Sequence, residues 1–336
     1  MNVRRLTTSG LTLGLIATLL AALTTTPATG LGKFVARDPA CYGKWDPIVN
    51  HNQAEAHHEH LFTGSTAICD LPNPNAANYD DLAGKGTNLN NPDDTAAYWI
   101  PSLVLTNGWQ GTSNLGRVND FRNYFAYYRC FNRDRTCTSA HRSVAHPADT
   151  RLVVGNAAQP ATVPLDTRWI NWTCGQESNR RGPYADIQTA NCSTATGTRV
   201  NLTLHVTFPS CWDGVKPNHS PTDVGDTRDN AHYMFANRRT DSCPSTHPVK
   251  VTELRATYKW GDNTPGYWTG KTPALVTDLM QRQAGNPVKA GQTAHADFWN
   301  TWEQNDTVPG TPTLHGGFDA MVTDCINSAP ETYCNN

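Results

Sequence analysis

A strict alternation of apolar and polar residues at positions 200–208 constrains the fold of this chain more than any other feature. A period of two is the pattern of a β-strand with one buried face. The residues on that face are Val200, Leu202, Leu204, Val206 and Phe208. Pro209 has no backbone N–H, so it ends the strand. The loop that follows, 210–214, carries a cysteine, an indole and a carboxylate on a rigid support, a position where proteins often place binding or catalytic groups.

Other segments predict further strands and few helices. Strands are expected within 97–105, where Pro101 indicates a sheet edge or a bulge, within 121–130, and within 249–260, where the alternation changes phase as at a bulge. A helix is predicted over 273–284, with Thr272 as N-cap and Gly285 as C-terminal stop, and a second, short helix over 294–302. Few helices among many short strands predict a mainly β fold, a β-sandwich or jelly roll with long, disulfide-stapled loops.

The first residues have the pattern of a signal peptide. Arg4 and Arg5 form a basic start, positions 11–23 are an apolar run too short to span a bilayer comfortably, and small residues at 28–30 fit a cleavage site. We therefore expect residues 1–30 to be removed. Residues 31–336 are expected to be a single secreted, extracellular domain without membrane contact, because no stretch has the composition of a linker. We also expect a monomer.

The charge of the chain argues against nucleic acid as a partner. Its formal net charge is −2, and only 17% of the residues are charged, with no basic block among them. Binding to a phosphate backbone needs a clustered basic surface, so the sequence predicts no nucleic-acid partner.

Ten cysteines in an exported chain predict disulfide bonds. The chain has no pair of CxxC motifs, so a structural zinc site is the weaker alternative. Spacing favours four pairs but does not establish connectivity. These pairs are Cys130 with Cys137, Cys174 with Cys192, Cys211 with Cys243, and Cys325 with Cys334.

A histidine pair could hold a metal or a substrate oxygen. If His58 and His60 lie on a strand, they project from one face, and their imidazoles suit a divalent transition metal such as zinc, copper, iron or nickel. Further ligands would come from Asp213, His232 and His247. The alternative is that one of the histidines is a buried, hydrogen-bonded residue and the others are merely exposed.

The loop after the strong strand offers a carboxylate beside an indole. Asp213 could act as a general acid or base, paired with His232 or His247, while Trp212 packs against a sugar ring. The alternative places Trp212 in the core and makes Asp213 a turn residue before Gly214.

A later histidine has a structural interpretation. His295 or Asp297 would cap the predicted second helix, whose Phe298 and Trp299 fill the core. The sequence also has no GxSxG, P-loop, GxGxxG or HExxH motif, so serine hydrolase, nucleotide-binding and zincin interpretations have no motif behind them.

Six short stretches resemble a secreted family of fungi and actinomycetes that is known as a domain of unknown function. They are HEHLFTG at 58–64, AYWIPSL at 97–103, FPSCWDG at 208–214, AHY at 231–233, CPSTHP at 243–248 and HADFWN at 295–300. The fungal members often carry WSC carbohydrate-binding modules. The resemblance therefore implies an extracellular domain associated with cell walls or polysaccharides, without an established reaction.

These observations leave three functional hypotheses. The leading one is a polysaccharide-active protein of hydrolase or lyase type. Its catalytic residues would be His60, Asp213, His232 and His247, and its sugar-packing residues Tyr98, Trp99 and Trp212. The second is a non-catalytic module that binds cell-wall glycan, and the third is a metal-binding protein with His58 and His60 as ligands.

Overall fold

Two antiparallel sheets form the body of the protein. The computed structural model describes residues 31–130, 137, 139–176, 179–195, 200–217, 232–262, 264–303 and 317–327. The predicted signal peptide lies outside these residues. The described part is mainly β, with short helices and several disulfide bonds, which confirms the predicted fold class.

The larger sheet has six strands and contains the segment whose alternation was strongest. In order across the sheet they are β1 (Leu31–Ala36), β7 (Phe121–Arg129), β15 (Glu253–Trp260), β11 (Asn201–Thr207), β9 (Ile170–Gly175) and β10 (Arg181–Tyr184). The strand predicted at 200–208 is β11, in the interior of this sheet, and its apolar side chains are buried. The strand predicted within 121–130 is β7.

The second sheet has five strands, and one of them begins with the predicted site residue His60. In order they are β2 (Cys41–Gly43), β3 (His60–Gly64), β4 (Ala97–Pro101), β17 (His295–Trp299) and β8 (Arg151–Gly155). Strand β17 pairs with β4 on one side and with β8 on the other, so its backbone hydrogen bonds are shared between two neighbours.

The two sheets share one core, which is rich in aromatic side chains. Tyr98 of the five-stranded sheet packs against Tyr124 of the six-stranded sheet with ring centroids 5.1 Å apart, and its hydroxyl lies 2.5 Å from that of Tyr128. Phe298 of β17 stacks on Tyr98 and meets Phe208 at 5.8 Å. Such aromatic pairs stabilise a core beyond the area they bury.

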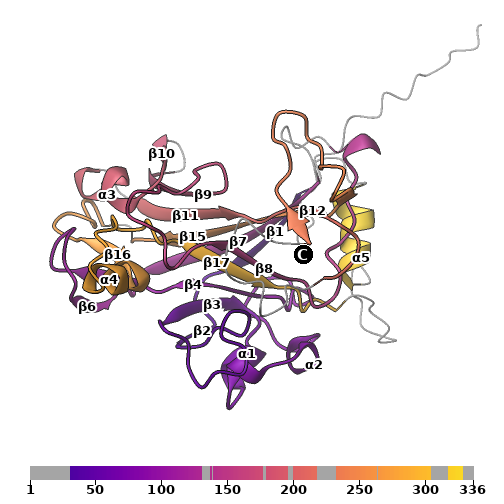
Figure 1. Cartoon of the computed structure of the whole chain (residues 1–336), viewed down its shortest axis with the longest axis horizontal. Helices are drawn as coiled ribbons and strands as arrows, with labels where there is room; N and C mark the ends of the chain where they lie inside the picture. Colours follow the sequence, from indigo (N-terminus) through magenta and orange to yellow (C-terminus); the bar gives the residue numbers. More distant parts are fainter. Residues whose placement is uncertain are drawn as a thin grey trace, which may run out of the picture.

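The other face of the five-stranded sheet is covered by residues from the segment between β2 and β4. Phe62, Trp99 and Trp299 form a second cluster there with Ile68 and Leu82 of two short helices. The helices are α1 (Ala67–Asp70) and α2 (Tyr79–Leu82), and Figure 1 shows both on the side of this sheet away from β11. Both faces of the sheet are therefore buried.

Two small sheets and further short helices complete the described part. The sheets are β16 (Pro273–Leu275), β5 (Leu103–Thr106) and β6 (Asn114–Arg117), and β13 (Tyr233–Met234), β12 (Cys211–Trp212) and β14 (Val249–Lys250). The helices are α3 (Ile187–Ala190), α4 (Val276–Gln283) and α5 (Gly317–Ala320), with 3₁₀ turns η1 (Pro74–Ala76), η2 (Ser139–His141) and η4 (Cys192–Thr194), and a π-helical segment η5 (Met321–Ile326). Among the described residues, no helix has the length and apolar character needed to cross a membrane.

Two predicted strands are each divided between two sheets. The segment 97–105 forms β4 and β5, which separate at Ser102, and Pro101 ends an interior strand instead of marking an edge. The segment 249–260 forms β14 and β15, so the change of phase is a change of sheet.

Both helix predictions need correction. Thr272 is not an N-cap, because its hydroxyl donates to the Thr106 carbonyl oxygen at 2.5 Å, and the helix begins later, at Val276. The predicted end holds, since Gly285 follows α4 with a φ of 84° that favours glycine. The predicted helix over 294–302 is wrong: this segment contains β17, because pairing with two neighbouring strands outweighs local helix propensity.

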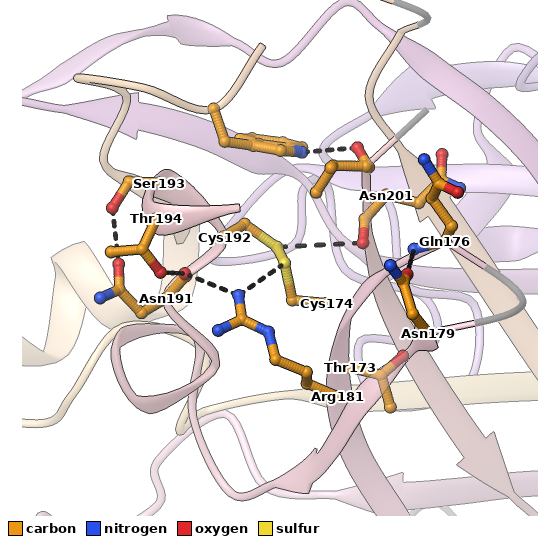
Figure 2. The surroundings of a disulfide bond; sticks show 12 residues. Thr173, Cys174, Gln176, Asn179, Arg181, Asn191, Cys192, Ser193, Thr194 and Asn201 are labelled. Carbon is orange, nitrogen blue, oxygen red and sulfur yellow. Dashed lines mark hydrogen bonds between the residues drawn. A yellow bond between two sulfur atoms is a disulfide. The ribbon is translucent and has the colours of Figure 1, made fainter. Parts of the chain in front are cut away.

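Four disulfide bonds join loops to the sheets. They are Cys41–Cys69, Cys130–Cys137, Cys174–Cys192 and Cys211–Cys243, which confirms three predicted pairs and adds the first. Figure 2 shows Cys174–Cys192, with the Arg181 guanidinium beside it donating to the Asn191 carbonyl oxygen. The predicted pair of Cys325 and Cys334 lies outside the described side chains.

A buried carboxyl under the five-stranded sheet makes stability depend on pH. Burial raises the pKa of Asp46 to about 6, although the backbone N–H of Val49 donates to its carboxyl group. Asp297 is fully buried close by, and burial followed by the charge of Asp46 holds the pKa of Asp297 well above its usual range. Ionising either carboxyl group inside the folded protein is therefore unfavourable.

We predict that Asp46→Asn stabilises the protein at pH 8 but much less at pH 5. Because the folded pKa is raised, the contribution of Asp46 is fully present below its unfolded pKa and is lost as pH rises through about 6. The difference between variant and wild type should grow by roughly 1–1.5 kcal/mol of unfolding free energy from pH 5 to pH 8. Urea unfolding at both pH values measures it, with the exposed Asp38→Asn as control; equal pH dependence in all three proteins would contradict the assignment.

Candidate functional site

Strand register places two histidines on opposite sides of one proline. In the pairing of β3 with β4, His60 lies opposite Pro101. The pairing of β17 with β4 matches Asp297 to Trp99, and continuing this register brings His295 to the other side of Pro101. Residues in one row across an antiparallel sheet project from the same face. The ring centroids of His60 and His295 lie 5.8 Å apart.

A third histidine completes a cluster. His58 lies two residues before β3, and its ring centroid is 4.2 Å from that of His60 and 5.1 Å from that of His295. Each of the three rings offers a nitrogen, and these nitrogens all lie within 4.8 Å of one another. Among the described residues, this is the group of histidine, cysteine or acidic side chains that could hold a metal ion. We call His58, His60 and His295 the histidine cluster.

The cluster is buried, and burial keeps its rings neutral. His60 is fully buried, while His58 and His295 are exposed by 8% and 4%. Burial, followed by the neighbouring histidines, lowers the pKa of His58 to about 2 and holds that of His60 well below its usual range. Burial also lowers the pKa of His295 to about 4. Neutral imidazole is the form that binds metals.

Hydrogen bonding leaves nitrogen lone pairs directed into the cluster. The Thr293 carbonyl oxygen can only accept, so the His295 Nδ1 at 3.0 Å donates to it, and the Nε2 of neutral His295 carries a lone pair. That Nε2 lies 3.1 Å from the Nε2 of His58. Both ring nitrogens of His60 are buried without a hydrogen bond of good geometry, although the Trp45 backbone lies near enough to favour its charged form.

A buried carboxylate orients the loop before His295. Asp278 of α4 accepts hydrogen bonds from the backbone N–H groups of Leu275, Gly291 and Thr293 and from the Thr293 hydroxyl. Burial raises the pKa of Asp278, and these donors oppose the shift. Asp278 therefore holds Thr293, whose carbonyl oxygen fixes the tautomer and orientation of His295. Such outer partners commonly orient metal-binding histidines.

The cluster borders an open pocket of about 550 Å³. His58 forms part of its wall, together with Lys44, Glu59 and Arg117 and with Val276 and Met280 of α4. The Arg117 guanidinium donates to the Glu59 carboxylate with its Nε 2.7 Å from Oε1, and it lies over the ring of Tyr42. A small molecule in the pocket would meet Lys44 and the Arg117–Glu59 pair beside His58.

Asp213 and His232 form a separate hydrogen-bonded pair. The Asp213 carboxylate lies 2.6 Å from the His232 Nδ1, and it also accepts from the Val215 backbone N–H at 2.8 Å. Partial burial raises the pKa of Asp213, but the hydrogen bonds from His232 and Val215 and the charges of His232 and His247 outweigh it, so the pKa is lowered. His247 is buried, and its Nδ1 lies 2.9 Å from the Thr246 hydroxyl. The sequence prediction of a histidine paired with Asp213 is therefore matched by His232.

The five histidine and aspartate residues expected at one site form two groups. Tyr233, next to His232, contacts Thr150 through hydroxyl groups 3.0 Å apart, and the Thr150 carbonyl oxygen accepts from Asn300 beyond the end of β17. His295 begins β17, so the groups are anchored roughly 16 Å apart along the strand direction. Figure 1 shows β12 and α4 at opposite ends of the molecule. The single polar hollow expected from the sequence is not formed.

The three aromatic residues expected to pack on sugar lie in other environments. Tyr98 and Trp99 are fully buried, one in each core, so neither offers a ring face to a ligand. Trp212 is partly exposed, but its ring stacks on Tyr233 and its Nε1 donates to the Lys216 carbonyl oxygen at 2.9 Å. Trp212 thus keeps only part of its surface available.

Sequence reasoning missed His295 as a member of the cluster. Because a helix was predicted over 294–302, His295 was interpreted as its cap. In the observed strand, His295, Asp297 and Trp299 project from one face. The alternation of Ala296 and Phe298 with these residues was the signal that could have identified the strand.

Fold and site define a disulfide-bonded, mainly β protein with a buried histidine cluster beside a pocket. The chain belongs to the family described as Domain of unknown function (DUF1996), whose match covers residues 46–302. All three histidines of the cluster, and the Asp213–His232 pair, lie within that span. Comparison with curated proteins and with solved structures found no match.

We predict that Asp278→Asn destabilises the protein by roughly 2–4 kcal/mol, because an amide cannot accept from all the buried donors that face the carboxylate. The midpoint of urea unfolding measures this loss. The exposed Asp80→Asn in α2 is the matched control and should change stability by less than about 0.5 kcal/mol. Equal midpoints for the two variants would show that Asp278 does not hold the loop before His295.

Proposed function

We propose that this protein is a metalloprotein whose histidine cluster binds one divalent transition metal beside a substrate pocket. The observation that carries the proposal is the convergence of three neutral, buried imidazoles, with both nitrogens of His60 unpartnered and no counter-charge among the groups that act on the rings. Burying the nitrogens of His60 without partners is unfavourable, and a bound cation would accept a lone pair from each of the three rings at once.

The donor set fits zinc best, with copper, nickel and iron as chemically related occupants. Three histidines with a remaining open position are a known arrangement of catalytic zinc sites, and neutral imidazoles suit all these metals. When bound there, such a metal supplies Lewis-acid chemistry to a group that enters from the pocket. The protein contributes orientation through Thr293 and Asp278 and a wall that largely excludes water from the cluster.

The pocket favours a ligand with an anionic or strongly polar group. Lys44 and Arg117 lie on its wall, and Glu59, already bound to Arg117, is the acidic residue among the described lining residues. A bound divalent cation would add to this positive field. An extracellular polysaccharide is our proposed substrate class, because that expectation comes from the family resemblance and a pocket of this size admits a sugar unit.

A second candidate site is the Asp213–His232 pair. A carboxylate that orients an imidazole through a 2.6 Å hydrogen bond is a common arrangement for general acid and base catalysis. If polysaccharide turnover does not depend on metal, we propose that the Asp213–His232 pair is the catalytic site, with Trp212 beside it. A purely glycan-binding role finds less support, because Tyr98 and Trp99 are buried.

We predict that the purified protein binds about one transition-metal ion per chain and that His60→Leu abolishes this binding. Leucine fills similar space without the two unsatisfied nitrogens of His60, so the thermal midpoint of the metal-free variant should not fall. Elemental analysis and calorimetric titration with Zn²⁺ measure stoichiometry and affinity, and loss of at least 100-fold in affinity is expected.

His57→Ala is the matched control for this experiment. His57 adjoins His58 in sequence and lines the same pocket, but it is exposed and does not belong to the cluster, so its replacement should leave metal affinity within about twofold. Equal losses in His57→Ala and His60→Leu, or no stoichiometric metal in the wild type, would reject the metal site.

We predict that Asp213→Asn separates the two candidate sites. If the Asp213–His232 pair carries catalysis, polysaccharide turnover should fall by roughly 10²–10⁴-fold, since the oriented acid–base group is lost. Zn²⁺ affinity should stay unchanged, because the pair lies far from the histidine cluster. Product release from a panel of cell-wall polysaccharides measures turnover; unchanged turnover in Asp213→Asn would remove the pair from the mechanism.

A further inference from the structure

The outer face of the six-stranded sheet is polar yet largely buried. On β11 the polar residues Thr203, His205 and Thr207 are exposed by only 3–4%. The register sets Thr207 opposite Arg255 of β15, and Thr203 opposite Thr173 of β9. The alternation in the sequence predicted a polar face, and polar faces of antiparallel sheets usually meet water. Here a layer of side chains and loops covers it.

A pocket of about 250 Å³ opens over this face, and its wall is basic. Four arginines contribute to it, together with hydroxyl and amide side chains from β9 and β11, while no aspartate or glutamate lies among its described lining residues. The arginines are Arg168, Arg180, Arg238 and Arg255. Arg168 is paired with Asp166, which lies outside the lining. Four guanidinium groups at one pocket are still a local concentration of positive charge in a chain with a net charge of −2.

Arg255 forms the floor of the pocket and is poorly satisfied. Its Nε is buried without a hydrogen-bond partner. Burial and the charges of Arg129 and Arg180 lower the pKa of its guanidinium to about 10. The charge of Glu253, on the same sheet face, acts on Arg255, but the Glu253 carboxylate is already bound to Arg129. The floor of the pocket therefore presents a cation whose counter-charge is used elsewhere.

Hydrogen bonds, ring stacking and a disulfide bond hold other groups at the pocket in place. The two ring nitrogens of His205 each lie 3.1 Å from a threonine hydroxyl, on Thr173 and Thr257. Arg238 stacks over the ring of Trp169, which in turn stacks on Phe235 with centroids 4.0 Å apart. The disulfide Cys174–Cys192 fixes β9 next to Thr173, as Figure 2 shows. These groups can receive a ligand with little reorganisation.

We infer that this pocket, which we call the arginine pocket, is a binding site for an oxyanion group, a carboxylate, sulfate or phosphate. Arginines in a fixed fork geometry bind such groups with paired, charge-assisted hydrogen bonds, and threonine hydroxyls supply further donors. The pocket holds one such group with part of the molecule that bears it. It lies on the opposite sheet from the histidine cluster, so this inference stands independently of the proposed function.

The experiment measures the thermal midpoint of the whole protein at low ionic strength with added oxyanions. We expect sodium sulfate or phosphate at about 10 mM to raise the midpoint by roughly 2–4 °C over sodium chloride of matched ionic strength. Arg255→Gln should remove this rise. The midpoint of Arg255→Gln without ligand should not fall below that of the wild type, because an unpaired buried cation is replaced by a neutral group.

Two further variants make the test decisive. Arg238→Gln changes an exposed side chain, so it cannot disturb the core, and it should weaken oxyanion binding at least tenfold in a calorimetric titration. Arg37→Gln changes an exposed arginine after β1, outside the pocket lining, and should bind like the wild type. The inference is overturned if no oxyanion stabilises the wild type or if Arg255→Gln and Arg238→Gln keep the full effect.

The same assay identifies the source of the oxyanion. Inorganic sulfate, inorganic phosphate, glucuronate and a sulfated disaccharide are titrated separately. Tighter binding of glucuronate or the sulfated disaccharide than of either inorganic ion assigns the pocket to the acidic substituent of a glycan. Equal or tighter binding of an inorganic ion assigns it to the free anion.

Discussion

The pairing of β17 with β4 and β8 is the constraint on which the rest of the structure depends. This strand contributes Ala296 and Phe298 to the core between the two sheets and directs His295, Asp297 and Trp299 to the opposite face. A slip of one residue would exchange the two sets, placing a carboxyl and an imidazole in the aromatic core. The same register brings His295 level with His60 across Pro101, so packing and site geometry are fixed together.

Burial of titratable side chains opposes folding at several places in the described part of the protein. The histidine cluster, the Asp46–Asp297 pair and Arg255 all lie where burial opposes their charged forms. Each such group reduces the free energy of unfolding, and the aromatic core and four disulfide bonds offset that loss. Proteins tolerate unfavourable burial mainly where a ligand or a reaction needs it.

Local patterns in the sequence predicted what depends on local structure. The alternation at 200–208 identified β11, and short spacings identified the disulfides Cys130–Cys137 and Cys174–Cys192. A pairing of Asp213 with His232 or His247 was also considered, because both histidines lie in loop-like segments after Asp213, and His232 makes this contact. By contrast, β17 was expected to be a helix, since its neighbours β4 and β8 are distant in sequence and their hydrogen bonds are invisible locally.

The grouping of the candidate site residues also depends on contacts between segments that are distant in sequence. Residue types alone joined His58 and His60 to Asp213, whereas the topology replaces Asp213 with His295 and moves the carboxylate to another end of the molecule. The burial of Thr203, His205 and Thr207 was likewise hidden, because the loops that cover them come from separate segments. Candidate site residues could be recognised from the sequence, but which of them lie close together could be seen only in the folded structure.

The central claim is that His58, His60 and His295 together bind one metal ion. X-ray absorption spectroscopy of the zinc-loaded protein tests it most directly, because imidazole ligands have a characteristic scattering pattern. The account predicts three imidazole nitrogens at about 2.0–2.1 Å from the metal in the wild type, and fewer in His295→Ala. A first shell of oxygen atoms alone, or a spectrum unchanged in His295→Ala, would contradict it.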